Sequence, residues 1–117
     1  MPRRDPEALL PLKPKPFHIL LALEEGGPLH GYAINKSMGE RSGGTVSMDP
    51  GGLYRLIARL ERDGLLGRTE APPDETDERR QYVDITDWGR AVLRAEARRI
   101  AGLAALPSVR DLAGPGA

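Results

Sequence analysis

The chain has 117 residues, with 17 Lys and Arg against 17 Asp and Glu, no cysteine and 39% apolar residues. This composition suits one domain with a single hydrophobic core, and it excludes a disulfide or a cysteine-ligated metal site. The longest apolar run, at residues 19–23, is far shorter than the ~20 residues of a membrane span, so we expect a soluble, cytoplasmic protein with no membrane partner.

The N-terminal part is interrupted by prolines and is predicted to be irregular, apart from one helical turn. Asp5 and Pro6 can begin that turn, because Asp caps a helix start and proline suits the first helical position. A first long helix is predicted over residues 16–25, where the apolar face is wide. Glycines and a proline end it, and a second helix is predicted over residues 30–40.

The middle of the chain is predicted to contain a strand stub at residues 45–48 and a third helix at residues 50–63. Asp49 and Pro50 repeat the capping pattern, and Gly64 ends the helix. Its inner face follows the i, i+3, i+4, i+7 spacing of a core-facing helix, with Leu53, Leu56, Ile57 and Leu60.

Two strands, at residues 65–71 and 81–85, are predicted to form a hairpin around an acidic tip at residues 72–78. Thr86 then caps a last helix that ends near residue 106. The predicted fold is mainly α with a small β-hairpin: a winged helix-turn-helix plus a long C-terminal dimerisation helix.

Four stretches resemble the PadR family of transcriptional regulators: ILLALEEGGPLHGY at 19–32, PGGLYRLIARLERDGL at 50–65, RRQY at 79–82 and ITDWGR at 85–90. The resemblance spans residues 19–99 and implies a winged helix-turn-helix that binds DNA as a homodimer. The chain departs from the family pattern at Gly52, where threonine is common, in its acidic wing and in its short C-terminal part.

The chain is therefore divided into a flexible or short helical extension at 1–15, a winged-helix DNA-binding domain at 16–86, a dimerisation helix at 87–107 and a disordered tail at 108–117.

The third helix is the candidate for reading a DNA groove. Its residues off the apolar stripe are Tyr54, Arg55, Ala58, Arg59 and Arg62. Arginine suits guanine edges and phosphates, and a small alanine allows close approach. Gly51 and Gly52 leave backbone N–H groups at the helix start, where a phosphate is favoured. The resemblance implies that the Tyr54 hydroxyl also binds a phosphate; the alternative for Arg59 is a surface ion pair with Asp63.

Arg79 and Arg80 lie where a wing would contact the DNA backbone or minor groove. The alternative is local pairing, with partners among Asp77, Glu78 and Asp84. The acidic tip is expected to point away from the duplex. Lys36, like Lys13 and Lys15, is a candidate backbone contact whose alternative is a solvated charge.

No catalytic residues, cofactor or metal site are predicted, so the protein is not expected to be an enzyme. His30 and His18 are expected to bond nearby backbone instead of a ligand. The family resemblance leaves a small hydrophobic effector open as a partner, although Trp88 is expected to pack against the hairpin.

The last helix is more apolar than its own hairpin can cover, which predicts a two-fold homodimer. The residues assigned to this interface are Leu93, Ala97, Ile100, Leu103 and Ala104. The alternative is that they complete the core of the monomer. A dimer would hold two recognition helices roughly 34 Å apart over a near-palindrome.

The predicted function is a sequence-specific DNA-binding transcriptional regulator, a repressor. The alternative is a winged-helix protein–protein interaction module that has lost DNA binding. The zero net charge, Gly52 and the acidic wing motivate this second interpretation.

Overall fold

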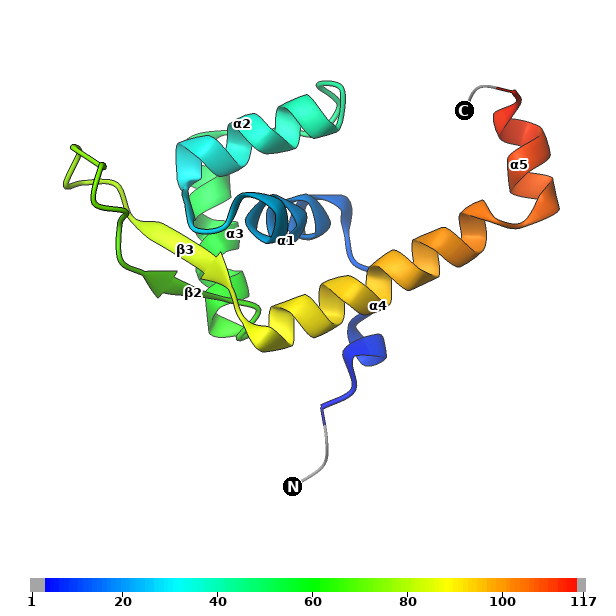
Figure 1. Cartoon of the computed structure of the whole chain (residues 1–117), viewed down its shortest axis with the longest axis horizontal. Helices are drawn as coiled ribbons and strands as arrows, with labels where there is room; N and C mark the ends of the chain where they lie inside the picture. The colour runs from blue at the N-terminus through cyan, green and yellow to red at the C-terminus, as the bar shows by residue number, and fades with distance from the viewer. Residues whose placement is uncertain (1–3, 116–117) are drawn as a thin grey trace.

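The computed structural model of the protein describes residues 4–115. Its elements in chain order are η1 (Pro6–Leu9), α1 (Pro14–Gly26), β1 (Leu29–His30), α2 (Gly31–Arg41), α3 (Pro50–Arg62), β2 (Leu66–Thr69), β3 (Tyr82–Ile85), α4 (Asp87–Ala104) and α5 (Pro107–Ala113). Helices α1 to α3 and the strands gather in one body, from which α4 runs outward and ends in α5 (Figure 1). This mainly helical fold with a small sheet confirms the predicted fold class.

The four long helices begin and end within two residues of the predicted bounds. Local capping explains this agreement for α2, α3 and α4, because the side chains of His30, Asp49 and Thr86 each accept a hydrogen bond from a first-turn N–H group, at 2.9 to 3.2 Å. Gly64 follows α3 with φ of +78°, as expected of a glycine at a helix end.

The sheet has three antiparallel strands in the order β1-β3-β2. Leu29 of β1 pairs with Val83 of β3, and Leu66 of β2 pairs with Ile85 at the other edge. The prediction of a strand at residues 45–48 is wrong, since this segment is irregular and the third strand is β1.

Side chains of α2 explain why residues 45–48 form no strand. The Asn35 amide donates to the Met48 carbonyl oxygen at 2.8 Å and accepts from the Met48 N–H at 3.2 Å. Ser42 Oγ likewise accepts from the Val46 N–H at 2.9 Å. The backbone groups that a neighbouring strand would have bonded are therefore already satisfied.

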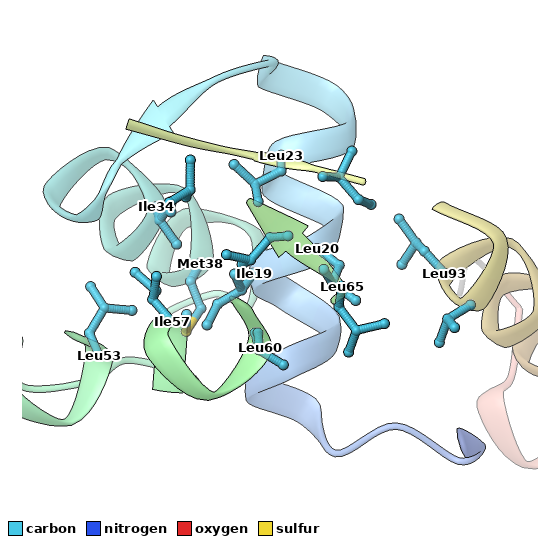
Figure 2. Packing of buried hydrophobic residues seen from close by; sticks show 14 residues of the cluster. Ile19, Leu20, Leu23, Ile34, Met38, Leu53, Ile57, Leu60, Leu65 and Leu93 are labelled. Atoms are coloured by element: carbon cyan, nitrogen blue, oxygen red, sulfur yellow. The ribbon is translucent and has the colours of Figure 1, made fainter. Parts of the chain in front are cut away.

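The core forms where the three helices of the body meet the sheet (Figure 2). It draws on α1 (Ile19, Leu20, Leu23), α2 (Ile34, Met38) and α3 (Leu53, Ile57, Leu60). Val92 and Leu93 belong to the same cluster, so the first half of α4 is part of the body.

The start of α4 is seated closely on the strand that follows α3. A Cβ atom built on Gly89 would lie 1.9 Å from the carbonyl oxygen of Leu65, so this position excludes any side chain. Thr86 Oγ1 also donates to the Gly64 carbonyl oxygen at 2.6 Å. Together these contacts fix the direction in which α4 leaves the body.

The N-terminal extension is held against α4 by a buried carboxylate. Glu96 is 1% exposed and accepts the Leu12 N–H at 2.7 Å, and it also pairs with Arg99. The Arg99 guanidinium lowers the pKa of the Glu96 carboxyl below its usual range, and the Leu12 N–H adds to this effect. Arg4 lies over the Trp88 ring, 5.2 Å from its centroid. The extension was predicted to be flexible or to form a short helix, and these contacts of Arg4 and Leu12 instead hold it against α4. Residues 1–3 lie outside the described part.

The C-terminal segment differs from the predicted disordered tail, because residues 107–113 form α5. Helix α4 ends at Ala104, before the predicted stop at Pro107, and Pro107 occupies the first position of the next helix, where its missing N–H costs nothing. The last two residues lie outside the described range. Within residues 4–115 no helix combines the length and the apolar character needed to cross a membrane.

Candidate nucleic-acid interface

Helix α3 has one buried face and one exposed face. Leu53, Ile57 and Leu60 are buried in the core, whereas Tyr54 is 60% exposed. The predicted contact residues Gly51, Tyr54, Arg55, Ala58, Arg59 and Arg62 all lie on exposed positions, and Gly52 is half-buried. The structure therefore brings the predicted α3 set together on one accessible surface.

The three arginines of this surface are free of carboxylate partners. Within residues 4–115 no carboxylate oxygen lies within 4.0 Å of the guanidinium groups of Arg55, Arg59 or Arg62. The alternative pairing of Arg59 with Asp63 is not formed. We call these three residues the arginine strip, since they repeat along one side of α3.

The start of α3 is less open than predicted. The Gly52 N–H donates to the Asp49 carboxylate at 3.0 Å, and this bond is the main reason that the pKa of Asp49 is lowered. The Leu53 N–H is bonded to the Asp49 carbonyl oxygen, also at 3.0 Å. The expectation that Gly52 offers a bare N–H group to a phosphate is therefore wrong, and only Gly51 keeps that role.

A close contact between α2 and α3 fixes the position of Tyr54. A Cβ on Gly31, the first residue of α2, would lie 3.2 Å from the Tyr54 ring and 3.3 Å from its hydroxyl oxygen. Next to Gly31 lies Tyr32, which is 71% exposed. Sequence reasoning missed Tyr32; its place in the GPLHGY stretch, directly after the cap of α2, was the available signal.

His30 has the structural role that the sequence predicted. Its Nδ1 accepts the Ala33 N–H at 3.2 Å and so caps α2. Burial, followed by the positive charge of Arg80, lowers the pKa of His30 below its usual value. Its ring also packs edge-on against the ring of Tyr82, with centroids 5.3 Å apart.

The wing tip is organised around Glu75. This carboxylate accepts the Tyr82 hydroxyl at 2.5 Å, the backbone N–H groups of Thr76 and Asp77, and Arg80 at 3.2 Å. These bonds, with that from Tyr82 the strongest, lower the pKa of Glu75 to about 2. Its side chain is 7% exposed.

Both wing arginines are held by carboxylates of the same tip. Arg79 pairs with Asp77 at 3.3 Å and Arg80 with Glu75 at 3.2 Å. The alternative of local pairing therefore describes both side chains, although Glu75 was not among the expected partners. The wing does not present them as free cations.

The predicted lysine contacts lie on exposed positions away from the wing. Lys36 is exposed on α2, while Lys13 and Lys15 flank the start of α1. The charges of Arg55 and Lys15 both help to lower the pKa of Asp49, so Lys15 lies near the start of α3.

The assigned dimer residues divide into two groups. Ala97, Ile100, Leu103 and Ala104 are exposed, with Ile100 at 39% and Leu103 at 47%. Leu93 is only 5% exposed and lies in the protomer's own core, so its assignment to the interface is wrong. The position of α4 explains this, since only its second half leaves the body.

Histidine and acidic residues form no metal site in the part of the chain that the structure describes. His18 does not bond nearby backbone as expected, because its buried Nδ1 has no hydrogen-bond partner within residues 4–115. Trp88 is half-buried and packs against the core cluster; its packing against the hairpin stays a prediction.

Comparison with known proteins places these features in context. Residues 19–95 match the model of the transcriptional regulator PadR-like family. An uncharacterized 37.1 kDa protein in transposon TN4556 of Streptomyces fradiae is 40% identical over 85 residues, which are 73% of this chain and 22% of that protein. The chain thus spans about a fifth of this relative's length.

Two solved structures are similar over most of the chain. A transcriptional regulator from Clostridium thermocellum has 25% identity and a TM-score of 0.62, covering 76% of this chain and 82% of that one. A complex structure of RosR from H. salinarum has 22% identity and a TM-score of 0.69, covering 93% and 90%. The fold is therefore that of known regulators.

Proposed function

The chain belongs to the transcriptional regulator PadR-like family, and from this premise we propose that it binds a near-palindromic DNA operator as a homodimer and represses transcription. The arginine strip of α3 would enter the major groove, while Tyr54, Tyr32 and the Gly51 N–H would bind phosphates. Nothing in this role requires catalysis, a metal or a cofactor.

The observation that carries the proposal is the availability of the arginine strip. Three guanidinium groups with no carboxylate partner among residues 4–115 stand on a helix whose opposite face is buried in the core. A guanidinium that is not already paired can bind guanine N7 and O6 in a bidentate manner, or a phosphate, without first breaking an ion pair. A rigidly capped helix also holds these groups in a constant orientation.

Repression and dimerisation rest on the projecting half of α4. Its exposed apolar side chains include Ile100 and Leu103, which a second copy would cover around a two-fold axis. The two recognition helices would then lie roughly 34 Å apart, one turn of DNA. A dimer bound across a promoter would block polymerase, and this is the mode of action that we propose.

A specific observation favours one other function. The wing arginines are neutralised by Asp77 and Glu75, and Asp49 places a carboxylate at the start of α3. A protein–protein interaction module without DNA binding would tolerate both features, whereas a DNA-binding protein must overcome them.

Selection of bound sequences from a random duplex pool tests the proposal. We expect enrichment of a palindromic site with half-site centres about 10 base pairs apart. Affinity for the selected site should fall with salt, with a log–log slope of about −0.9 per phosphate contact. No enrichment, together with no binding at low salt, would favour the interaction module.

A promoter reporter tests repression separately. The selected site placed over the promoter should lower expression when the protein is present. Unchanged expression in the presence of tight binding in vitro would contradict the repressor role while leaving DNA binding intact.

A further inference from the structure

A groove runs between the N-terminal extension and α3. It has a volume of about 1200 Å³, and its walls include Leu9 and Leu12 of the extension, Leu56 of α3 and Trp88 at the start of α4. Glu96 maintains one wall, because its bond to the Leu12 N–H ties the extension to α4. The groove is therefore held in shape by contacts within the subunit, and it is lined in part by apolar side chains.

Helix α5 has an apolar face that no other described part of its own subunit covers. None of its residues is buried, and Leu112 is 88% exposed and Val109 38% exposed. These two side chains are three residues apart, which places them on the same face of the helix. An exposed apolar face on an ordered terminal helix calls for a covering surface.

The groove of the same subunit cannot cover α5. Trp88 lies at the first turn of α4, and α5 follows the last turn. The 18 residues of α4 separate the two by about 27 Å. Figure 1 shows α5 at the outer end of α4, away from the body. Any groove that receives α5 must belong to another molecule.

A two-fold pairing of α4 helices supplies such a groove. The part of α4 that leaves the body is residues 97–104, and all of these residues except the half-buried Arg99 are exposed. Antiparallel crossing at the middle of this part places residue 104, the last of α4, level with residue 97 of the other subunit. Helix α5 is set off from α4 by the extended residue Leu106 and turned away from the α4 axis (Figure 1), so it begins near the level of the other subunit's Glu96, which holds Leu12 at the wall of the groove.

The usual size of a stable dimer interface also favours a contribution from α5. Stable dimers bury about 800 Å² per partner, with ~20–30 residues on each side. Residues 97–104 alone are too few, whereas adding α5 and the groove that receives it reaches this range. Asp111 of α5 also has opposite charges at the groove, since Lys13 and Lys15 line it.

We propose that in the homodimer α5 of each subunit docks into the groove between the N-terminal extension and α3 of the other subunit. This inference rests on the proposed homodimer and adds the elements that complete it. The groove borders Arg59 of the arginine strip, so the docked helix of one subunit supports the recognition helix of the other.

Cross-linking between subunits tests this placement directly, because the chain contains no cysteine of its own. Leu9→Cys and Leu112→Cys are made in separate chains with different tags, mixed to exchange subunits, and treated with a short bismaleimide. We expect a cross-linked dimer that carries both tags. The matched control combines Leu112→Cys with Glu40→Cys, an exposed position at the end of α2, and should give no such product.

The possible outcomes distinguish failure of the homodimer from failure of the α5 docking alone. Wild-type protein that is monomeric by light scattering at micromolar concentration would overturn the homodimer, and the docking with it. A wild-type dimer without a 9–112 cross-link, or with equal 40–112 cross-linking, would overturn only the docking of α5.

A pair of polar substitutions gives an independent measure. Leu112→Gln should raise the dimer Kd about tenfold or more, because the side chain is buried only in the dimer. Arg110→Gln lies on the other side of α5 and should change the dimer Kd by less than about twofold. Both variants should keep the far-ultraviolet circular dichroism of the wild type. Equal dimer Kd values for the two variants would overturn the docking.

Discussion

Helix α3 and the wing both carry arginines, but among residues 4–115 those of the wing form ion pairs and those of α3 do not. The arginine strip has no carboxylate partner within the described residues, whereas Arg79 and Arg80 are each held by a carboxylate of the wing tip. A phosphate can bind the first group without breaking an ion pair, whereas each guanidinium of the second group already shares its hydrogen-bond donors with an acid. The number of arginines in a segment is therefore a poor guide to DNA binding, and their existing partners decide which of them are available.

The strongest test of this difference removes the two pairs of arginines in turn. Arg55→Ala with Arg59→Ala should weaken operator binding by ~10–100-fold for each side chain, as expected for bidentate base or phosphate contacts. Arg79→Ala with Arg80→Ala should change affinity less than about threefold. Fluorescence anisotropy on the selected site measures both, and light scattering should show unchanged dimers.

Equal losses for the two double variants would show that the wing pairs open on DNA. Wild-type affinity in the α3 variant would contradict the assignment of the arginine strip as the reading surface.

Asp49 offers a test in the direction of stronger binding. Asparagine also caps helices, so Asp49→Asn should preserve α3 while removing the negative charge at its start. We expect affinity for DNA to rise about two- to fivefold, the usual worth of one charge at a helix terminus. Asp49→Ala is the control, since it removes the same charge but loses the cap, worth about 1 kcal/mol of stability. Unchanged affinity in Asp49→Asn would place the start of α3 away from the phosphates.

Replacing Glu75 should leave Arg80 of the wing without its carboxylate partner, as the arginines of α3 already are within the described range. Glu75→Gln weakens the hold on Arg80, and we expect affinity for DNA to rise about twofold and the salt slope to steepen by up to ~0.9. Glu78→Gln makes the same change of charge at an exposed position without an ion pair in the described structure. If the two variants behave alike, net charge and not release of Arg80 is the cause.

The pH dependence of the wing follows from the same carboxylate. The pKa of Glu75 is about 2, below its ordinary value near 4.5. A depressed carboxyl pKa stabilises the folded wing above pH 4.5, and this contribution is lost as pH falls from there through 2. Nuclear magnetic resonance of the Tyr82 ring should report an ordered wing at pH 5 and a loosened one near pH 2.

His30, which caps α2 and packs against Tyr82 of the wing, should give the smallest effect. Its lowered pKa means that the folded protein holds the neutral form, so stability is complete above pH 6.5 and declines as pH falls below this value. The expected loss of folding stability is a fraction of the contribution of one N-cap, which is about 1 kcal/mol. Thermal unfolding at pH 7.5 and 5.5 measures it, and His30→Asn, which retains a capping oxygen, should flatten the difference. An equal pH dependence in this variant would assign the effect to other groups.

The helical part of the fold could be predicted because its determinants are local. Asp49 and Pro50 begin α3, Gly64 ends it, and Thr86 begins α4, each through contacts within a few residues. The exposed and buried faces of α3 followed from spacing alone. This is why the arginine strip was found from the sequence.

The errors arose where distant side chains decide the outcome. Asn35 satisfies the backbone of Met48, so a β-branched segment forms no strand. Glu96 binds the backbone of Leu12 across 84 positions of sequence. Two-residue strand β1 and the tight pairing of the wing with Glu75 likewise depend on tertiary contacts, which periodicity does not record.

The seat of Gly89 on Leu65 has a mechanical consequence. Because there is no room for even one methyl group between them, α4 packs tightly at its root against the body that carries α3. In the proposed dimer, a change in the angle at which two α4 helices cross would therefore be passed on to the two α3 helices and would alter their spacing on an operator.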